Sequence, residues 1–167
     1  MSHHEAHGIA ADLPPGWHGQ VYRRRDEDDE PGTVTAQAVR GGATFHAATV
    51  PLEGGEADFG SSVTVRMGRR DIFLSLFEYT VDEHLTPGVG LFEARGTPWP
   101  LEPGEFRASA LQVAVPGQAG LQRFFTVGER PFCLYVVIGS QRRAARRVRA
   151  ANQVLESIRI EPGPLPG

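Results

Sequence analysis

LQRFFTVGERPFCLYVVIGSQRRAARRVRAANQVLESIRI, residues 121–160, is the stretch that decides the fold. Its start predicts a strand over 121–127, and the Gly-Glu-Arg-Pro of 128–131 is typical of a hairpin loop. Residues 132–138 are apolar almost throughout, which predicts a central strand buried on both faces. The stretch therefore begins with an antiparallel hairpin whose second strand lies inside a sheet.

An amphipathic helix follows this hairpin. Ser140 is a suitable N-cap, and apolar residues spaced by three and four predict a helix over 141–155. The apolar stripe consists of Ala144, Val148, Ala151 and Leu155. Residues 157–160 then predict a short returning strand.

The first half of the chain predicts further strands and a second helix. The predicted strands cover 9–13, 17–24, 43–50 and 62–67. Asp71 is a suitable N-cap, and the apolar residues after it predict a helix over 71–80. Together these elements predict an α+β fold, in which two main helices pack on an antiparallel sheet as a two-layer sandwich.

The length of 167 residues fits one domain, which we place at 9–161. Residues 1–8 are polar and predict a flexible, histidine-containing tail, and residues 162–167 predict a second tail. Proline and glycine are frequent in 81–104, which predicts a long irregular connection with one strand over 89–94.

Composition excludes several classes of function. The formal net charge of −3 gives no chain-wide basic field, which argues against nucleic acid as a partner. Every basic residue is an arginine, which excludes Schiff-base and P-loop lysine chemistry. The single cysteine, Cys133, excludes a disulfide within the chain. No secretory signal and no membrane-length apolar run are present, which predicts a cytoplasmic protein without a membrane partner.

Two parts of the chain resemble the PsbP/Mog1-like fold. They are 9–24, where "LPPGW" leads into a strand, and 120–161, with its order of hairpin, "FCLYVVIGS", amphipathic helix and "VLESIRI". The stretch "QRFFTVGERPFCLYVVIG" is also similar to a group of uncharacterised actinobacterial proteins. The resemblance implies a mostly non-enzymatic bacterial protein, because members bind a small GTPase, dock on a photosynthetic complex or are lipoproteins. It transfers no functional residue to this chain.

The N-terminal histidines predict a metal site. If the initiator Met is removed, the amine, two backbone amides and a third-position histidine can surround Cu(II) or Ni(II) in a square plane. The residues concerned are His3, His4 and His7. The alternative is a flexible tail that binds metal adventitiously, with no cofactor at all.

The predicted helix 141–155 carries a basic face. Arg142, Arg143, Arg146 and Arg147 recur at helical spacing, with Arg149 beside them. Guanidinium groups in this pattern can bind phosphate or an acidic partner bidentately. The alternative is an ordinary solvated helix face. No aromatic residue stands beside the arginines for base stacking, which again argues against nucleic acid.

Trp99, in the sequence Thr-Pro-Trp-Pro, is the second candidate for partner binding. A proline-braced tryptophan on a long loop is typical of a binding anchor. The alternative is a side chain that fills the open edge of the core. The sequence leaves these two interpretations open.

The leading functional hypothesis is a non-catalytic domain that binds another protein or assembles a complex; a homo-oligomer is also compatible with the sequence. The alternative is a small-molecule or metal-binding protein, or a weak enzyme. It would use a cleft between 81–104 and the sheet, with His46, Asp58 or Glu78 converging there. A triad of His46, Asp58 and a serine has no support beyond residue type, because no nucleophile elbow is present.

Overall fold

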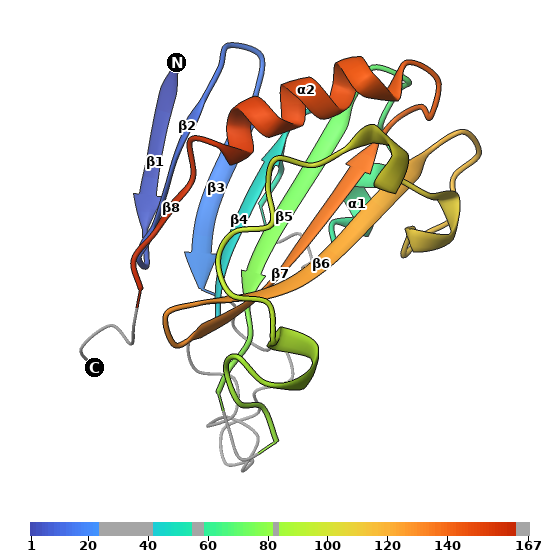
Figure 1. Cartoon of the computed structure of the whole chain (residues 1–167). Helices are drawn as coiled ribbons and strands as arrows, with labels where there is room; N and C mark the ends of the chain where they lie inside the picture. Colours follow the sequence, from blue (N-terminus) through green and yellow to red (C-terminus); the bar gives the residue numbers. More distant parts are fainter. Residues whose placement is uncertain (24–41, 55–58, 82–83, 163–167) are drawn as a thin grey trace, which may run out of the picture.

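The structure is a computed structural model that describes residues 1–23, 42–54, 59–81 and 84–162. Five antiparallel strands form the main sheet in the order β3-β4-β5-β7-β6 (Figure 1). The strands are β3 (His18–Arg23), β4 (Ala43–Ala48), β5 (Ile72–Glu78), β6 (Ala119–Val127) and β7 (Arg130–Ile138). All nine residues of β7 are buried, which confirms the predicted central strand.

A second sheet has three antiparallel strands in the order β1-β2-β8. They are β1 (Ser2–Ala6), β2 (Ile9–Leu13) and β8 (Arg159–Ile160). The prediction of a flexible tail over 1–8 was therefore wrong. Positive φ angles at His7 (53°) and Gly8 (77°) suit the tight two-residue hairpin turn that returns β1 onto β2. Backbone pairing holds β1 there, so its polar side chains can stay on the surface.

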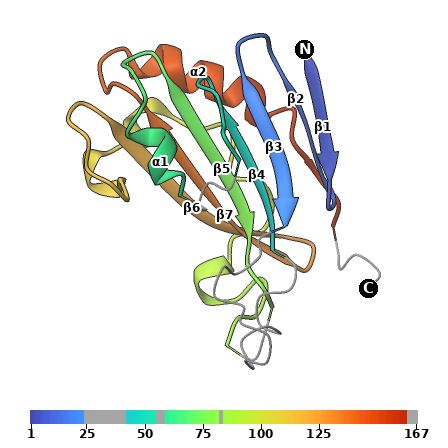
Figure 2. The same cartoon turned by 180° about the vertical axis from the view of Figure 1, so that it is seen from behind.

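Helices cover both faces of the main sheet. The longer helix, α2 (Ala144–Leu155), lies across one face, and the short α1 (Ser61–Thr64) lies on the other (Figures 1 and 2). Alternate residues of β5 follow this division. Leu74 and Leu76 belong to the hydrophobic cluster that includes α2, whereas Phe73 packs in the cluster that includes Val63 of α1.

The structure confirms the α+β class and corrects the count of helices. The predicted helix over 71–80 was wrong, because residues 72–78 form the strand β5. A strand buried on both faces is apolar at nearly every position and shows no alternation. The predicted strand over 62–67 was also wrong: Val63 is buried in α1, and Val65 is 56% exposed just after it. Among the described residues, α2 is the one helix longer than a single turn.

Several boundaries differ in smaller ways. Ser140 accepts a hydrogen bond from the amide of Arg142 at 3.1 Å, and the helix begins only at Ala144. The strand predicted over 89–94 is instead a 3₁₀ turn, η2 (Gly90–Phe92). The predicted C-terminal tail lies, apart from Pro162, outside the described residues. In the described part of the chain, no helix combines the length and the apolar character that crossing a membrane requires.

The remaining elements in 81–118 are two further 3₁₀ turns, η3 (Pro103–Glu105) and η4 (Ala108–Ala110). The segment around them runs over the same sheet face as α2 (Figure 1). Leu101 and Phe106 are buried in the cluster that α2 completes. The long connection is thus part of the core covering on this face.

Candidate functional site

Four arginines line one pocket at the start of α2. Its volume is about 370 Å³, and its lining residues are Thr49, Arg70, Ile72, Arg143, Arg146, Arg147 and Ala150. We call it the arginine pocket. Ile72 supplies a buried apolar floor, while Arg70, Arg143 and Arg146 are exposed at the rim.

Two elements bring these arginines together. Arg143, Arg146 and Arg147 follow the helical spacing of i, i+3 and i+4, so they share one face of α2 and its entry. Arg70 comes from the turn before β5. Gly139 allows that turn to approach the end of β7, just before α2, because a Cβ atom at position 139 would stand 1.9 Å from the carbonyl oxygen of Gly68.

Like charges determine the electrostatics of the pocket. The pKa of Arg147 lies below its ordinary value because of partial burial and because Arg143, Arg70 and Arg146 repel its charge; Asp71 acts in the opposite direction. The Arg147 guanidinium donates to the carbonyl oxygens of Arg69, Arg142 (3.2 Å) and Arg143 (3.3 Å). These contacts orient the group without neutralising it.

Asp71, an acidic side chain that acts on Arg147, has both carboxylate oxygens engaged in hydrogen bonds. One carboxylate oxygen accepts a hydrogen bond from the Thr49 hydroxyl at 2.9 Å, and the other accepts one from the Gly68 amide at 2.7 Å. None of the ion pairs formed within residues 1–23, 42–54, 59–81 and 84–162 includes an arginine of the pocket. The pocket therefore presents unneutralised positive charge to solvent.

Arg143 holds a backbone conformation that disfavours any side chain. Its φ of 56° and ψ of 34° lie in the left-handed region, and no side chain caps the helix at this position. For a residue other than glycine this conformation costs about 1–2 kcal/mol. Strain of this kind is more frequent at functional sites than elsewhere. The side chain of Arg143 thus lies in the pocket at an energetic cost to the fold.

Arg143→Gly is expected to raise the free energy of unfolding by about 0.5–1 kcal/mol. The gain is the relief of left-handed strain minus the extra freedom of glycine in the unfolded chain. Arg146→Gly is the matched control, because it lies inside α2 and should lower the free energy of unfolding by about 1 kcal/mol. Chemical denaturation measures both, and a loss of stability in Arg143→Gly would contradict the assigned strain.

The sequence-predicted arginines do not all face the same hollow. Arg142 lines a neighbouring pocket of about 550 Å³ together with Arg69 and the turn of Pro116 and Gly117. Arg149 lines a groove on another side of α2. Arg70 was missed by the sequence analysis, because only the fold brings it to the helix.

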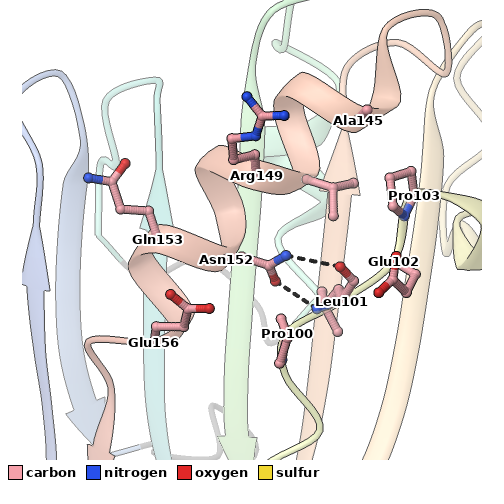
Figure 3. A pocket seen from close by; sticks show the side chains of 10 residues that line it. Pro100, Leu101, Glu102, Pro103, Ala145, Arg149, Asn152, Gln153 and Glu156 are labelled. Atoms are coloured by element: carbon pink, nitrogen blue, oxygen red, sulfur yellow. Dashed lines mark hydrogen bonds between the residues drawn. The ribbon is translucent and has the colours of Figure 1, made fainter.

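That groove lies between α2 and the segment from Pro100 to Pro103, and its volume is about 590 Å³ (Figure 3). The Asn152 side chain holds the segment in place: its amide donates to the Leu101 carbonyl at 2.9 Å, and its oxygen accepts from the Leu101 amide at 2.7 Å. This groove lies beside the C-terminal part of the 81–104 segment and opens next to α2. A cleft between 81–104 and the sheet stays a prediction.

The residues proposed for that cleft do not meet in it. His46 is fully buried in β4 between the rings of Tyr22 and Phe73, at centroid distances of 5.5 and 5.2 Å. Glu78 forms a buried ion pair with Arg130 at 2.8 Å. Asp58 lies outside the described residues. His46 and Glu78 therefore do not meet, and the hypothesis of a small-molecule or metal-binding protein or a weak enzyme stays a prediction.

Trp99 lies away from the arginine pocket. Its indole is half-buried against the main hydrophobic cluster and meets the ring of Phe125 edge to face, with centroids 6.0 Å apart and planes at 82°. Trp99 thus packs at the edge of the core, and its role in partner binding stays a prediction.

The N-terminal histidines lie on or beside β1. His3 contacts two carboxylates: Nδ1 is 2.7 Å from Asp12, and Nε2 is 3.0 Å from Glu5. His7 occupies the hairpin turn, and His4 contacts the hydroxyl of Ser2 at 3.2 Å. In the described part of the chain, no three histidine, cysteine or acidic side chains are grouped to hold a metal. Copper or nickel binding by the N-terminal amine and amides stays a prediction.

His3 makes the pairing of β1 with β2 depend on pH. The hydrogen bonds to Asp12 and Glu5 raise the pKa of His3 above its ordinary 6.5, and the bond to His3 lowers the pKa of Asp12 below 3.8. The contribution of protonated His3 to the free energy of unfolding is thus full below the pKa of His3 in the unfolded chain. It is lost as pH rises through the raised pKa of the folded state. The contribution of Asp12 is lost as pH falls through its lowered value.

His3→Gln is therefore expected to lower the melting temperature more at about pH 5.5 than at about pH 8.5. His18→Gln is the control, because His18 is an exposed histidine on β3 that contacts no carboxylate of the described chain. Melting curves recorded at both pH values test this. If His3→Gln lowers the melting temperature equally at both pH values, the hydrogen bonds of His3, and not its charge, stabilise the pairing of β1 with β2.

In comparisons with protein-family models, with curated proteins and with solved structures, the chain has no match.

Proposed function

We propose that this chain is a non-catalytic binding domain whose arginine pocket docks an acidic segment of a partner protein. The observation that carries the proposal is the convergence of Arg70, Arg143, Arg146 and Arg147 on one pocket, without an ion-pair partner among the described residues. Guanidinium groups pair bidentately with carboxylates, and such pairs supply orientation as well as energy.

An acidic ligand would offset the electrostatic repulsion among the arginines of the pocket. Partial burial and the charges of Arg143, Arg70 and Arg146 lower the pKa of Arg147. An anion between them offsets that repulsion, so the pocket gains more from a bound carboxylate than an isolated surface arginine does. A positive pocket also steers an acidic partner during encounter, and salt should weaken that attraction.

The resemblance to the PsbP/Mog1-like fold supports the same proposal. Most members of that fold are non-enzymatic, and some of them bind a small GTPase or dock on a photosynthetic complex. This support is an analogy at the level of the fold, and it concerns residues 9–24 and 120–161. The analogy does not identify the surface that binds the partner, and we propose that surface from the arginine pocket alone.

The test is affinity purification from the native organism with a C-terminal tag, followed by mass spectrometry. Arg146→Glu is compared with Arg149→Glu, which reverses an equally exposed charge on the same helix outside the pocket. A partner that the wild type and Arg149→Glu recover, and that Arg146→Glu loses by at least about tenfold, supports the proposal. A partner recovered equally by all three would overturn it.

A further inference from the structure

We propose that the arginine pocket is a phosphate site, which binds the phosphoryl group of a phosphorylated side chain in the partner segment. This inference rests on the proposed function and narrows its ligand from any acidic segment to a phosphorylated one. It starts from the charge and the shape of the pocket.

The charge of the pocket exceeds what one carboxylate can neutralise. Four guanidinium groups line it, and among the described residues Asp71 is the acidic side chain that acts on one of them, Arg147. The net charge of the four arginines and Asp71 is therefore about three positive charges. A phosphorylated side chain brings about 1.5–2 negative charges on one compact group, with three acceptor oxygens, whereas a carboxylate brings one charge and two oxygens. The phosphoryl group is the better match in both charge and number of acceptors.

The arginines approach from two sides, which suits a tetrahedral anion. Arg70 lies on the turn before β5, and the other three lie on α2 and its entry. Arg147 is already oriented by three backbone carbonyls, so ordering it on binding costs little side-chain entropy. A phosphoryl group offers guanidinium groups from two elements three acceptor oxygens, whereas a carboxylate offers two.

The size of the pocket leaves room for the residue that carries the phosphate. Its volume is about 370 Å³. Ile72 and Ala150 offer apolar surface beside the charges, where the aliphatic part of a peptide can pack. The start of α2 adds to the attraction, because a helix N-terminus without a side-chain cap presents backbone N–H groups and the positive end of the helix dipole.

The direct test compares three peptides of the form Gly-Ser-Gly-X-Gly-Ser-Gly, where X is phosphoserine, glutamate or serine. Binding to the full chain is measured by fluorescence anisotropy at low salt. We expect the phosphoserine peptide to bind at least about tenfold more tightly than the glutamate peptide. Arg146→Gln should weaken phosphoserine binding at least about tenfold, and Arg149→Gln, the matched control outside the pocket, should leave it unchanged.

A second arm uses the native partner. Treating the lysate with a broad-specificity protein phosphatase before purification should abolish capture by the wild-type chain. Unchanged capture after phosphatase treatment, together with loss of capture in Arg146→Glu, would overturn the phosphate site and leave acidic docking intact. If neither phosphatase treatment nor Arg146→Glu changes the amount of partner captured, both proposals are overturned.

Two other polyanions test whether the pocket instead binds the phosphates of a nucleic acid or of a membrane surface. Single-stranded DNA and vesicles containing phosphatidylserine are titrated in the same buffer as the peptides. If either binds more tightly than the phosphoserine peptide and depends on Arg146, the pocket recognises phosphates of a nucleic acid or a membrane surface, and the proposed phosphorylated protein segment is wrong. Weaker binding of both than of the phosphoserine peptide supports it.

Discussion

Arg130→Met is expected to lower the free energy of unfolding by about 3–5 kcal/mol. The Arg130 side chain is 4% exposed and binds the Glu78 carboxylate twice: Nε donates to Oε2 at 2.8 Å, and Nη2 donates to Oε1 at 2.9 Å. Methionine keeps much of the aliphatic chain but none of the donors. Glu78, itself 15% exposed, would then keep its charge without this partner where little water can replace it.

The effect should extend beyond the ion pair, because Arg130 joins the two sheets. Its guanidinium also donates to the carbonyl oxygens of His7 (3.0 Å), Gly8 (3.3 Å) and Glu161 (3.1 Å). These carbonyls belong to the β1–β2 turn and to the chain just after β8, whereas Glu78 ends β5. The same side chain therefore clamps the three-stranded sheet onto the five-stranded one.

Equilibrium denaturation of Arg130→Met measures this loss, and Arg123→Met is the matched control. Arg123 pairs with Glu105 at 2.8 Å, but the two side chains are 40% and 38% exposed, so its loss should cost less than about 1 kcal/mol. Similar small losses in both variants would show that burial does not strengthen the Arg130 pair. The double variant with Glu78→Leu should recover part of the stability, because it removes the buried charge.

The C-terminal third could be predicted because its signals are local. The hairpin of β6 and β7, the helix after it and the final strand all follow from periodicity and turn residues within 121–160. Even the burial of Cys133 follows from its place in an apolar run. Local patterns sufficed here because β6 and β7 pair with each other as a hairpin and the helix carries its own periodicity. β8 pairs with the distant β2, but its strand signal is local.

β5 and β1 could not be predicted by the same reasoning. β5 is apolar at almost every position because both faces are covered, so a strand and a helix give the same pattern over 71–80. β1 is polar and becomes a strand only because it pairs with β2 across a His-Gly turn. In both cases the tertiary partner decides the structure, and the segment itself carries no signal of that partner.

The candidate site was predicted in part for the same reason. Helical spacing alone placed Arg143, Arg146 and Arg147 on one face. Arg70 is distant in sequence, and it reaches the pocket through the close approach of Gly68 to Gly139. The sequence also left the left-handed backbone of Arg143 undetected, because nothing in the residue type indicates it.

Val137→Asp is expected to abolish cooperative folding at neutral pH. Val137 is fully buried in β7, opposite Phe73 of β5 and Gly120 of β6, and it packs in the cluster with Val63 and Tyr135. An unpaired carboxylate there costs several kcal/mol, a large share of the roughly 5–15 kcal/mol that stabilises a domain. Burial also raises the pKa of the introduced carboxyl, so acid should restore part of the stability by protonating it.

Thermal unfolding followed by circular dichroism tests this at neutral and at acidic pH. Val89→Asp is the control, because Val89 is 61% exposed and its replacement should change stability by less than about 0.5 kcal/mol. Val136→Asp places the same charge on the opposite face of β7, under α2. If both core variants fail to fold, β7 is buried on both faces. If Val137→Asp alone melts cooperatively at a temperature near that of the wild type, water reaches position 137. The hydrophobic cluster of Val63, Phe73 and Tyr135 on the α1 side of the sheet then does not exclude solvent.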